Sequence, residues 1–162
     1  PTGTAGTFTY TLVSVKDNSS TACVQTQTGT AAITVNPLPT ATIAASAAAV
    51  CQNAATPNVT FTGAGGTAPY TFTYKLNGGT DQTVTTISGN AVTVAQPTGT
   101  AGTFTYTLVS VKDDSSTACV QTQTGTAAIT VNPLPTATIA ASAAAVCQNA
   151  ATPNVTFTGA GG

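Results

Sequence analysis

Short segments in which apolar and polar residues alternate recur along the chain, separated by turn-forming residues. In residues 70–76 the even positions carry Tyr, Phe or Leu, and the odd positions carry Thr or Lys. An extended chain places alternate residues on opposite faces, so this pattern predicts a strand with one buried face. We therefore expect Tyr70, Phe72 and Tyr74 in the core and not on an exposed sugar-binding platform.

The same criterion predicts seven strands between residues 37 and 132. They are expected at residues 40–45, 58–63, 70–76, 82–87, 91–95, 103–111 and 119–131. The alternation in the last of these changes phase at Gly125, which predicts a β-bulge there. The alanine-rich segment 44–50 is too short to hold a helix alone and is expected to be irregular or an edge strand. Seven short strands in about 96 residues are typical of an all-β, immunoglobulin-like β-sandwich.

The chain contains a long internal repeat. Residues 1–66 recur as residues 97–162 with 65 of 66 positions identical, and the only difference is Asn18 against Asp114. An offset of 96 suits a small domain with its own core and is too long for one turn of a solenoid.

A proline-rich motif sets the phase of the repeat. Two prolines in four residues cannot lie in the centre of a sheet, so the motif predicts linkers. It occurs twice, as Asn36, Pro37, Leu38 and Pro39 and as Asn132, Pro133, Leu134 and Pro135. We expect residues 1–36 to be the C-terminal strands of a preceding repeat, 37–132 a complete repeat, and 133–162 the N-terminal strands of the following repeat. Because these boundaries fall inside repeats, we expect the sequence to be a window from a longer repetitive polypeptide.

Charge is almost absent. The chain has three Lys, four Asp and no Glu, Arg or His, with a net charge of −1, whereas it has 38 Thr and 29 Ala. General acid–base catalysis by His or Glu is excluded, and no pattern pairs a nucleophile with a base, so we expect neither an enzyme nor a cofactor. There is no basic cluster to attract nucleic acid and no apolar run long enough to insert in a membrane.

Two motifs carry a resemblance to a known family. Residues 59–72 (VTFTGAGGTAPYTF) resemble the core of SprB-type and PKD-like repeats, and residues 102–108 (GTFTYTL) resemble the strand that ends such domains. The Asn-Pro-Leu-Pro linker and the segment Val50-Cys51-Gln52 are similar to those of tandem immunoglobulin-like repeats in giant cell-surface adhesins and filament proteins of Bacteroidota. The resemblance implies secretion to the cell surface by a type IX system, and a role in adhesion, surface filaments or gliding motility.

The four cysteines, two per repeat, fall at positions 23, 51, 119 and 147. In a secreted β-protein that lacks His and C-x-x-C spacing, they are expected to form disulfides and not a zinc site. Within the complete repeat only Cys51 and Cys119 can pair, and we expect that bridge. The alternatives are free buried thiols, a bridge across a junction (Cys23 to Cys51, or Cys119 to Cys147), or a bridge between chains.

Asp113 and Asp114 invite comparison with a calcium site. Calcium takes roughly six to eight oxygen ligands, usually with several carboxylates. The repeat has only one further acid, Asp81, so a solvated turn is expected.

These features predict a structural repeat of a long secreted stalk, filament or adhesin on the cell surface. An odd number of strands sends the chain out at the end opposite its start. Repeats are therefore expected to stack end to end, so that their number sets the reach of the stalk. The expected partners are neighbouring repeats of the same chain and lateral copies in a filament. The alternative is a module that binds glycans or surfaces through the loops at residues 96–102 or 113–117.

Overall fold

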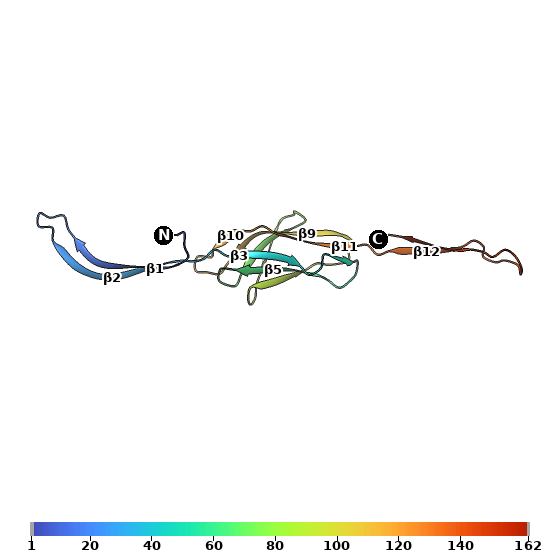
Figure 1. Ribbon diagram of the computed structural model, residues 1–162, viewed down its shortest axis with the longest axis horizontal. Helices are drawn as coiled ribbons and strands as arrows, with labels where there is room; N and C mark the ends of the chain where they lie inside the picture. The colour runs from blue at the N-terminus through green and yellow to red at the C-terminus, as the bar shows by residue number, and fades with distance from the viewer. Residues whose placement is uncertain (1, 162) are drawn as a thin grey trace.

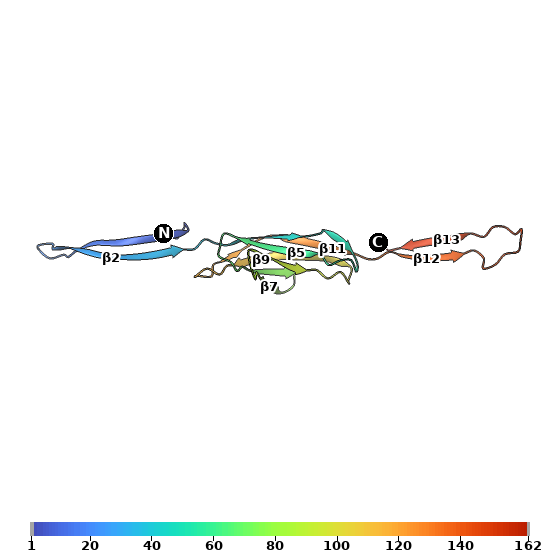
Figure 2. The ribbon, with the colours of Figure 1, turned by 90° about the horizontal axis from the view of Figure 1, so that it is seen from below.

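The computed structural model describes residues 2–161, and the regular structure of these residues is entirely β-strand. Three parts follow one another along one long axis (Figures 1 and 2). A hairpin of β1 (Gly6–Lys16) and β2 (Val24–Val35) comes first, a central unit of β3 to β11 follows, and a hairpin of β12 (Thr136–Ala141) and β13 (Val155–Ala160) comes last. Pro1 and Gly162, the ends of the expected flanking segments, lie outside the described residues.

The central unit, by which we mean residues 37–132, contains two β-sheets. One has the strand order β4-β11-β9-β6-β7 with β10 also on β9, and the other has the order β3-β5-β8. The neighbours are antiparallel except β4 and β11, which are parallel. The bounds are β3 (Thr40–Ala45), β4 (Ala49–Cys51), β5 (Asn58–Ala64), β6 (Thr71–Leu76), β7 (Asp81–Thr85), β8 (Ala91–Ala95), β9 (Gly102–Lys112), β10 (Val120–Thr122) and β11 (Thr126–Asn132). The arrangement is compatible with a β-sandwich.

Both sheets contribute to one hydrophobic core. The expected strand face is buried, with Tyr70, Phe72 and Tyr74 exposing 2%, 0% and 6% of their surface. Phe61 crosses from the opposite sheet, and its ring centroid lies 5.7 Å from that of Phe72 and 5.0 Å from that of Tyr74. The prediction that these aromatic residues form the core is confirmed. The other buried apolar residues in this cluster are Ala41, Val59, Tyr106, Leu108, Val111, Ala127 and Ile129.

Two further expectations, for residues 44–50 and for the bulge near Gly125, agree with the structure. Segment 44–50 forms no helix, and its end contributes to β4, a short parallel edge strand on β11. The predicted strand at 119–131 is divided into β10 and β11, and the register against β9 shifts by one residue between them, as expected for a bulge near Gly125. The break lies where β3 crosses. The backbone N–H of Ala41 donates to the side-chain Oε1 of Gln123 at 3.2 Å, and a Cβ at Gly125 would lie only 3.1 Å from Cγ2 of Ile43.

The central unit receives the chain at one end and releases it at the other. The first linker leads into β3 beside the β10 end, and β11 leaves at the end where β4 lies (Figure 1). The flanking hairpins point away from these two ends along the long axis, and they leave large apolar side chains such as Leu12 and Phe157 more than half exposed. We call the end reached from residue 36 the proximal end and the end left at residue 132 the distal end.

Candidate functional site at the two ends of the central unit

At the proximal end, the first linker is fixed to the central unit. The Asn36 side-chain amide donates to Ser116 Oγ at 3.1 Å and to Thr117 Oγ1 at 3.0 Å. Pro39, at the other end of the linker, is buried, whereas Leu38 remains 58% exposed. These contacts tie the first residue of the linker to the loop between β9 and β10, so the linker is docked and not a free tether.

Asp113 organises that loop from a buried position. Its carboxylate accepts from the Ser115 hydroxyl at 2.8 Å and from the backbone N–H groups of Ser115 at 3.3 Å and Thr67 at 3.2 Å. Burial by itself raises the pKa of this carboxyl, but these bonds outweigh it, led by the Ser115 hydroxyl, and the pKa is lowered. The carboxylate is therefore a structural cap for the turn.

The expected solvated turn is thus wrong for Asp113, which is only 2% exposed, and right for the exposed Asp114. Asp81, the third acid of the repeat, instead makes an exposed ion pair with Lys75 at 3.7 Å. Within residues 2–161 no group of three or more acidic or Cys side chains is placed to hold a metal ion.

At the distal end, Cys51 lies beside the residue from which the second linker starts. Cys51 is the register partner of Asn132 in the parallel β4–β11 pair, and the next N–H, of Gln52, donates to the Asn132 carbonyl at 2.7 Å. The Gln52 side chain donates to the carbonyl of Gly99 at 2.7 Å, which fixes the loop 96–102 at the same end. Asn132, Pro133, Leu134 and Pro135 are exposed.

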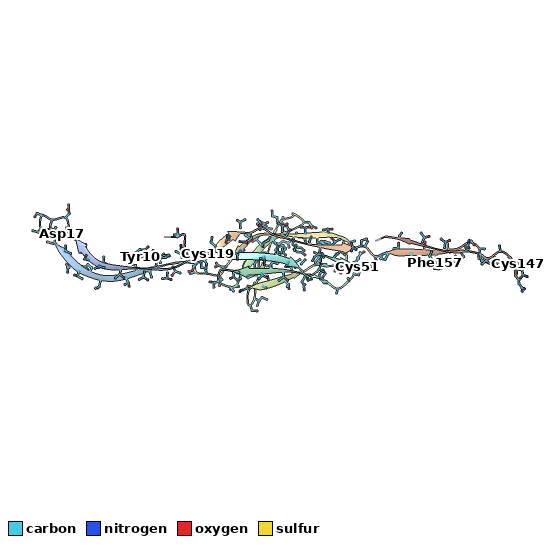
Figure 3. All side chains as sticks on the ribbon, in the orientation of Figure 1. Tyr10, Asp17, Cys51, Cys119, Cys147 and Phe157 are labelled. Atoms are coloured by element: carbon cyan, nitrogen blue, oxygen red, sulfur yellow. The ribbon has the colours of Figure 1, made fainter. Side chains whose placement is uncertain are left out.

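The expected Cys51–Cys119 bridge is contradicted by this topology. Cys51 lies one residue beyond the level of Gly102, the first residue of β9. The carbonyl of Cys119 accepts from the N–H of Asp113, which directly follows the last residue of β9. Because β9 has eleven residues, the two cysteines are separated by about 35 Å at about 3.3 Å per residue. A disulfide needs Cα atoms within about 7 Å. Figure 3 shows the two at opposite ends of the unit, and all four cysteines are free thiols.

The two alternative junction pairs also fail. The carbonyl of Cys23 accepts from Asp17, at the outer tip of the first hairpin, and Cys147 lies at the outer tip of the last hairpin (Figure 3). Neither tip is near the central unit. The alternative of free buried thiols does not hold either, since Cys51 is exposed and Cys119 is half-buried. Hydrogen bonds with Thr21 and Ser19 lower the pKa of the Cys23 thiol, which favours the reactive thiolate.

A cavity of about 500 Å³ opens near the distal end and is lined in part by the loop 96–102. Its floor includes two tyrosines whose hydroxyls are already paired: Tyr106 donates to Gln96 Oε1 at 2.8 Å and Tyr74 to Gln82 Oε1 at 3.1 Å. Burial raises the pKa of both phenols, and proximity to Tyr74 adds to the rise at Tyr106, so both remain neutral donors. The cavity is mostly apolar and could hold a small ring.

Sequence reasoning identified both linkers and the two loops but missed their contacts. Ser116 and Thr117 accept hydrogen bonds from Asn36, which lies 80 and 81 positions away, and the Gln96 side chain accepts one from Tyr106 in the core. Short polar residues in a loop give no signal of a partner so distant in sequence. The repeat itself was the available signal, because it marks Asn36 and Asn132 as equivalent positions on successive units.

Among residues 2–161 no helix is long and apolar enough to cross a membrane. Comparisons of the chain with protein-family models, with curated proteins and with solved structures give no match.

Proposed function

We propose that this chain is part of a long secreted stalk, filament or adhesin on the cell surface, built from immunoglobulin-like repeats of about 96 residues. In this proposal residues 37–132 are one complete repeat. Residues 1–36 are the last strands of the repeat before it, and residues 133–162 are the first strands of the repeat after it. The chain resembles SprB-type and PKD-like repeats in the motifs described above.

The observation that carries the proposal is the passage of the chain through the central unit from one end to the other, with both flanking hairpins on the same axis (Figures 1 and 2). The linkers are short and contain two prolines each, which favours an extended, stiff connection. The docked Asn36 further restricts bending at the proximal end. Reach would then grow in proportion to the number of repeats.

The near-identity of the two copies favours a mechanical role over a recognition role. Units that differ at one position in 66 provide no separate specificities, whereas adding copies lengthens the array. With so few charges the units repel one another weakly, which would also allow lateral packing with other copies.

The test is X-ray scattering from the chain lengthened at its C-terminus by one, two or four copies of residues 67–162, which continue the repeat in phase. We expect the maximum dimension to increase by roughly 40 to 50 Å per copy, from strands of eleven residues at about 3.3 Å each plus the linker. The control carries Gly in place of both prolines of every linker and should be more flexible. Growth with the square root of copy number in the unchanged series would refute the stalk.

A glycan- or surface-binding module is the second candidate, and the cavity beside the loop 96–102 is the observation in its favour. Its tyrosines are almost fully buried, so it offers no exposed aromatic platform of the kind that sugars stack on. Glycan-array binding that is lost in Phe104→Ala, a change in the cavity lining, would support this candidate.

A further inference from the structure

The proximal end of the central unit holds a cysteine next to a residue that comes from the unit before it. Thr117 Oγ1 lies 3.0 Å from the Asn36 amide nitrogen and 3.2 Å from the Cys119 sulfur. A single hydroxyl therefore separates the end of one repeat from the thiol of the next. Cys119 is half-buried here, whereas Cys23, the same residue in the first hairpin with no docked linker, is exposed.

The distal end holds the other cysteine of the repeat next to the equivalent of Asn36. Asn132 occupies the same position as Asn36 one repeat later, and it is directly opposite Cys51 in the parallel strand pair. Paired residues on neighbouring strands are about 4.8 Å apart and direct their side chains to the same face of the sheet. Both Asn132 and Cys51 are exposed, so this is the outer face.

In an array of repeats, the distal end of one unit meets the proximal end of the next. When a complete unit precedes another, its Asn132 docks on the next unit as Asn36 docks here, and its Cys51 lies beside that asparagine on the same face. Cys51 is therefore carried to the loop that holds Cys119 of the following unit. Residues 1–36 contain the docked asparagine but not the matching cysteine, and residues 133–162 do not extend to the matching loop.

We propose that Cys51 of each repeat forms a disulfide with Cys119 of the repeat that follows it, so that every junction of the array carries a covalent lock. The inference rests on the proposed end-to-end array. It explains why each repeat keeps two cysteines at opposite ends that cannot reach each other. The bond would clamp the junction beside the start of the proline linker and oppose bending and pulling apart.

The bond forms by thiol–disulfide exchange with a disulfide oxidant, such as oxidised glutathione or an extracytoplasmic dithiol oxidase. One cysteine thiolate attacks the oxidant to give a mixed disulfide and releases the first thiol of the oxidant. The second cysteine thiolate then displaces the remaining half. The two cysteines are oxidised, and the oxidant's disulfide is reduced to two thiols, which take up the two protons.

The test uses the chain lengthened by one copy of residues 67–162, which completes the repeat that follows the central unit. In the first variant every cysteine except Cys51 and the appended copy of Cys119 is changed to Ser. After exposure to oxidised glutathione, we expect a monomer in which neither thiol can be alkylated. Its mass should be about 2 Da lower, as for one intramolecular disulfide, and reduction should make both thiols reactive again.

Two matched variants keep the same number of thiols in the same lengthened chain. One retains Cys51 and Cys119 of the same repeat, and the other retains Cys119 and Cys147. Both should keep their thiols open to alkylation. Equal disulfide formation in all three variants would overturn the proposal. The absence of a disulfide in the first variant would also overturn it, provided that its urea unfolding matches that of the unsubstituted chain. X-ray scattering from the reduced chains distinguishes failure of the disulfide proposal from failure of the stalk proposal. A rigid array that forms no disulfide would refute the disulfide alone, whereas a flexible array would refute the stalk.

Discussion

Residues 6–35 and residues 102–131 are one sequence in two settings, with Asn18 against Asp114 as the only difference. In the central unit Tyr106, Leu108 and Ile129 expose 2%, 2% and 0% of their surface. Their equivalents in the first hairpin, Tyr10, Leu12 and Ile33, expose 51%, 52% and 57%. The rest of the repeat, and not the hairpin sequence, therefore decides whether these side chains are buried.

Strand pairing, in contrast, is the same in the hairpin that lacks the rest of the repeat. Both settings keep the antiparallel partners and even the same contact between threonine hydroxyls, at 3.1 Å for Thr7 with Thr34 and 3.2 Å for Thr103 with Thr130. What changes is continuity: β2 runs unbroken, whereas the same residues form β10 and β11 where β3 crosses them. Pairing is specified locally, and the break is imposed by tertiary contact.

The largest effect on stability is expected from changing which strands share a chain. Residues 37–132 and residues 1–96 both contain every strand sequence of one repeat, in permuted order. We expect 37–132 to unfold cooperatively in urea as a monomer and 1–96 to lack that transition. In 1–96 the four linker residues, which span at most about 14 Å, would have to connect the distal end to the proximal end, about 35 Å away. A cooperatively folded monomer of 1–96 would show that these two ends are not opposite.

Removing one aromatic side chain from each setting should give the next largest difference. Phe61 is 0% exposed in the core, and its equivalent Phe157 is 75% exposed. Phe61→Ala should lower the free energy of unfolding of the central unit by about 3 to 5 kcal/mol. Phe157→Ala should change it by less than about 0.5 kcal/mol. Urea titration of both variants measures this, and similar losses would mean that the last hairpin is packed in solution.

A smaller effect is expected from adding one methyl group. A Cβ at Gly63 would lie 2.6 Å from Cγ of Tyr70, whose ring is held in the core, whereas at the equivalent Gly159 the nearest atom is 3.9 Å away. Gly63→Ala should destabilise the central unit by about 1 to 3 kcal/mol through overpacking. Gly159→Ala should leave it unchanged. Thermal unfolding of the two variants distinguishes them, and tolerance of Gly63→Ala would show that Tyr70 can move.

These contrasts indicate what the sequence could and could not predict. Alternation gave the bounds of β3 and β8 correctly, since each strand's pattern depends on the face it buries. The repeat and its prolines gave the linkers. The cysteine pairing was wrong because spacing does not tell which end of a sandwich a residue occupies. That depends on the eleven residues of β9 between them and on the parallel pairing of β4, a strand the alternation did not indicate.

The smallest expected effect concerns the two equivalent aspartates, Asp17 and Asp113. Hydrogen bonds lower the pKa of both carboxyls, chiefly from the Ser19 side chain for Asp17 and, against the effect of burial, from Ser115 for Asp113. Only Asp113 belongs to a unit with a buried hydrophobic core. A carboxyl whose pKa is lower in the folded state adds stability that is complete above its unfolded pKa, near 3.8, and is lost as the pH falls through the folded value. The urea midpoint should therefore fall below about pH 4, and it should fall less steeply in Asp113→Asn. Asp17→Asn is the matched control and should follow the unsubstituted chain at every pH. If instead Asp113→Asn keeps the full acid dependence, the carboxylate does not cap the loop that receives Asn36.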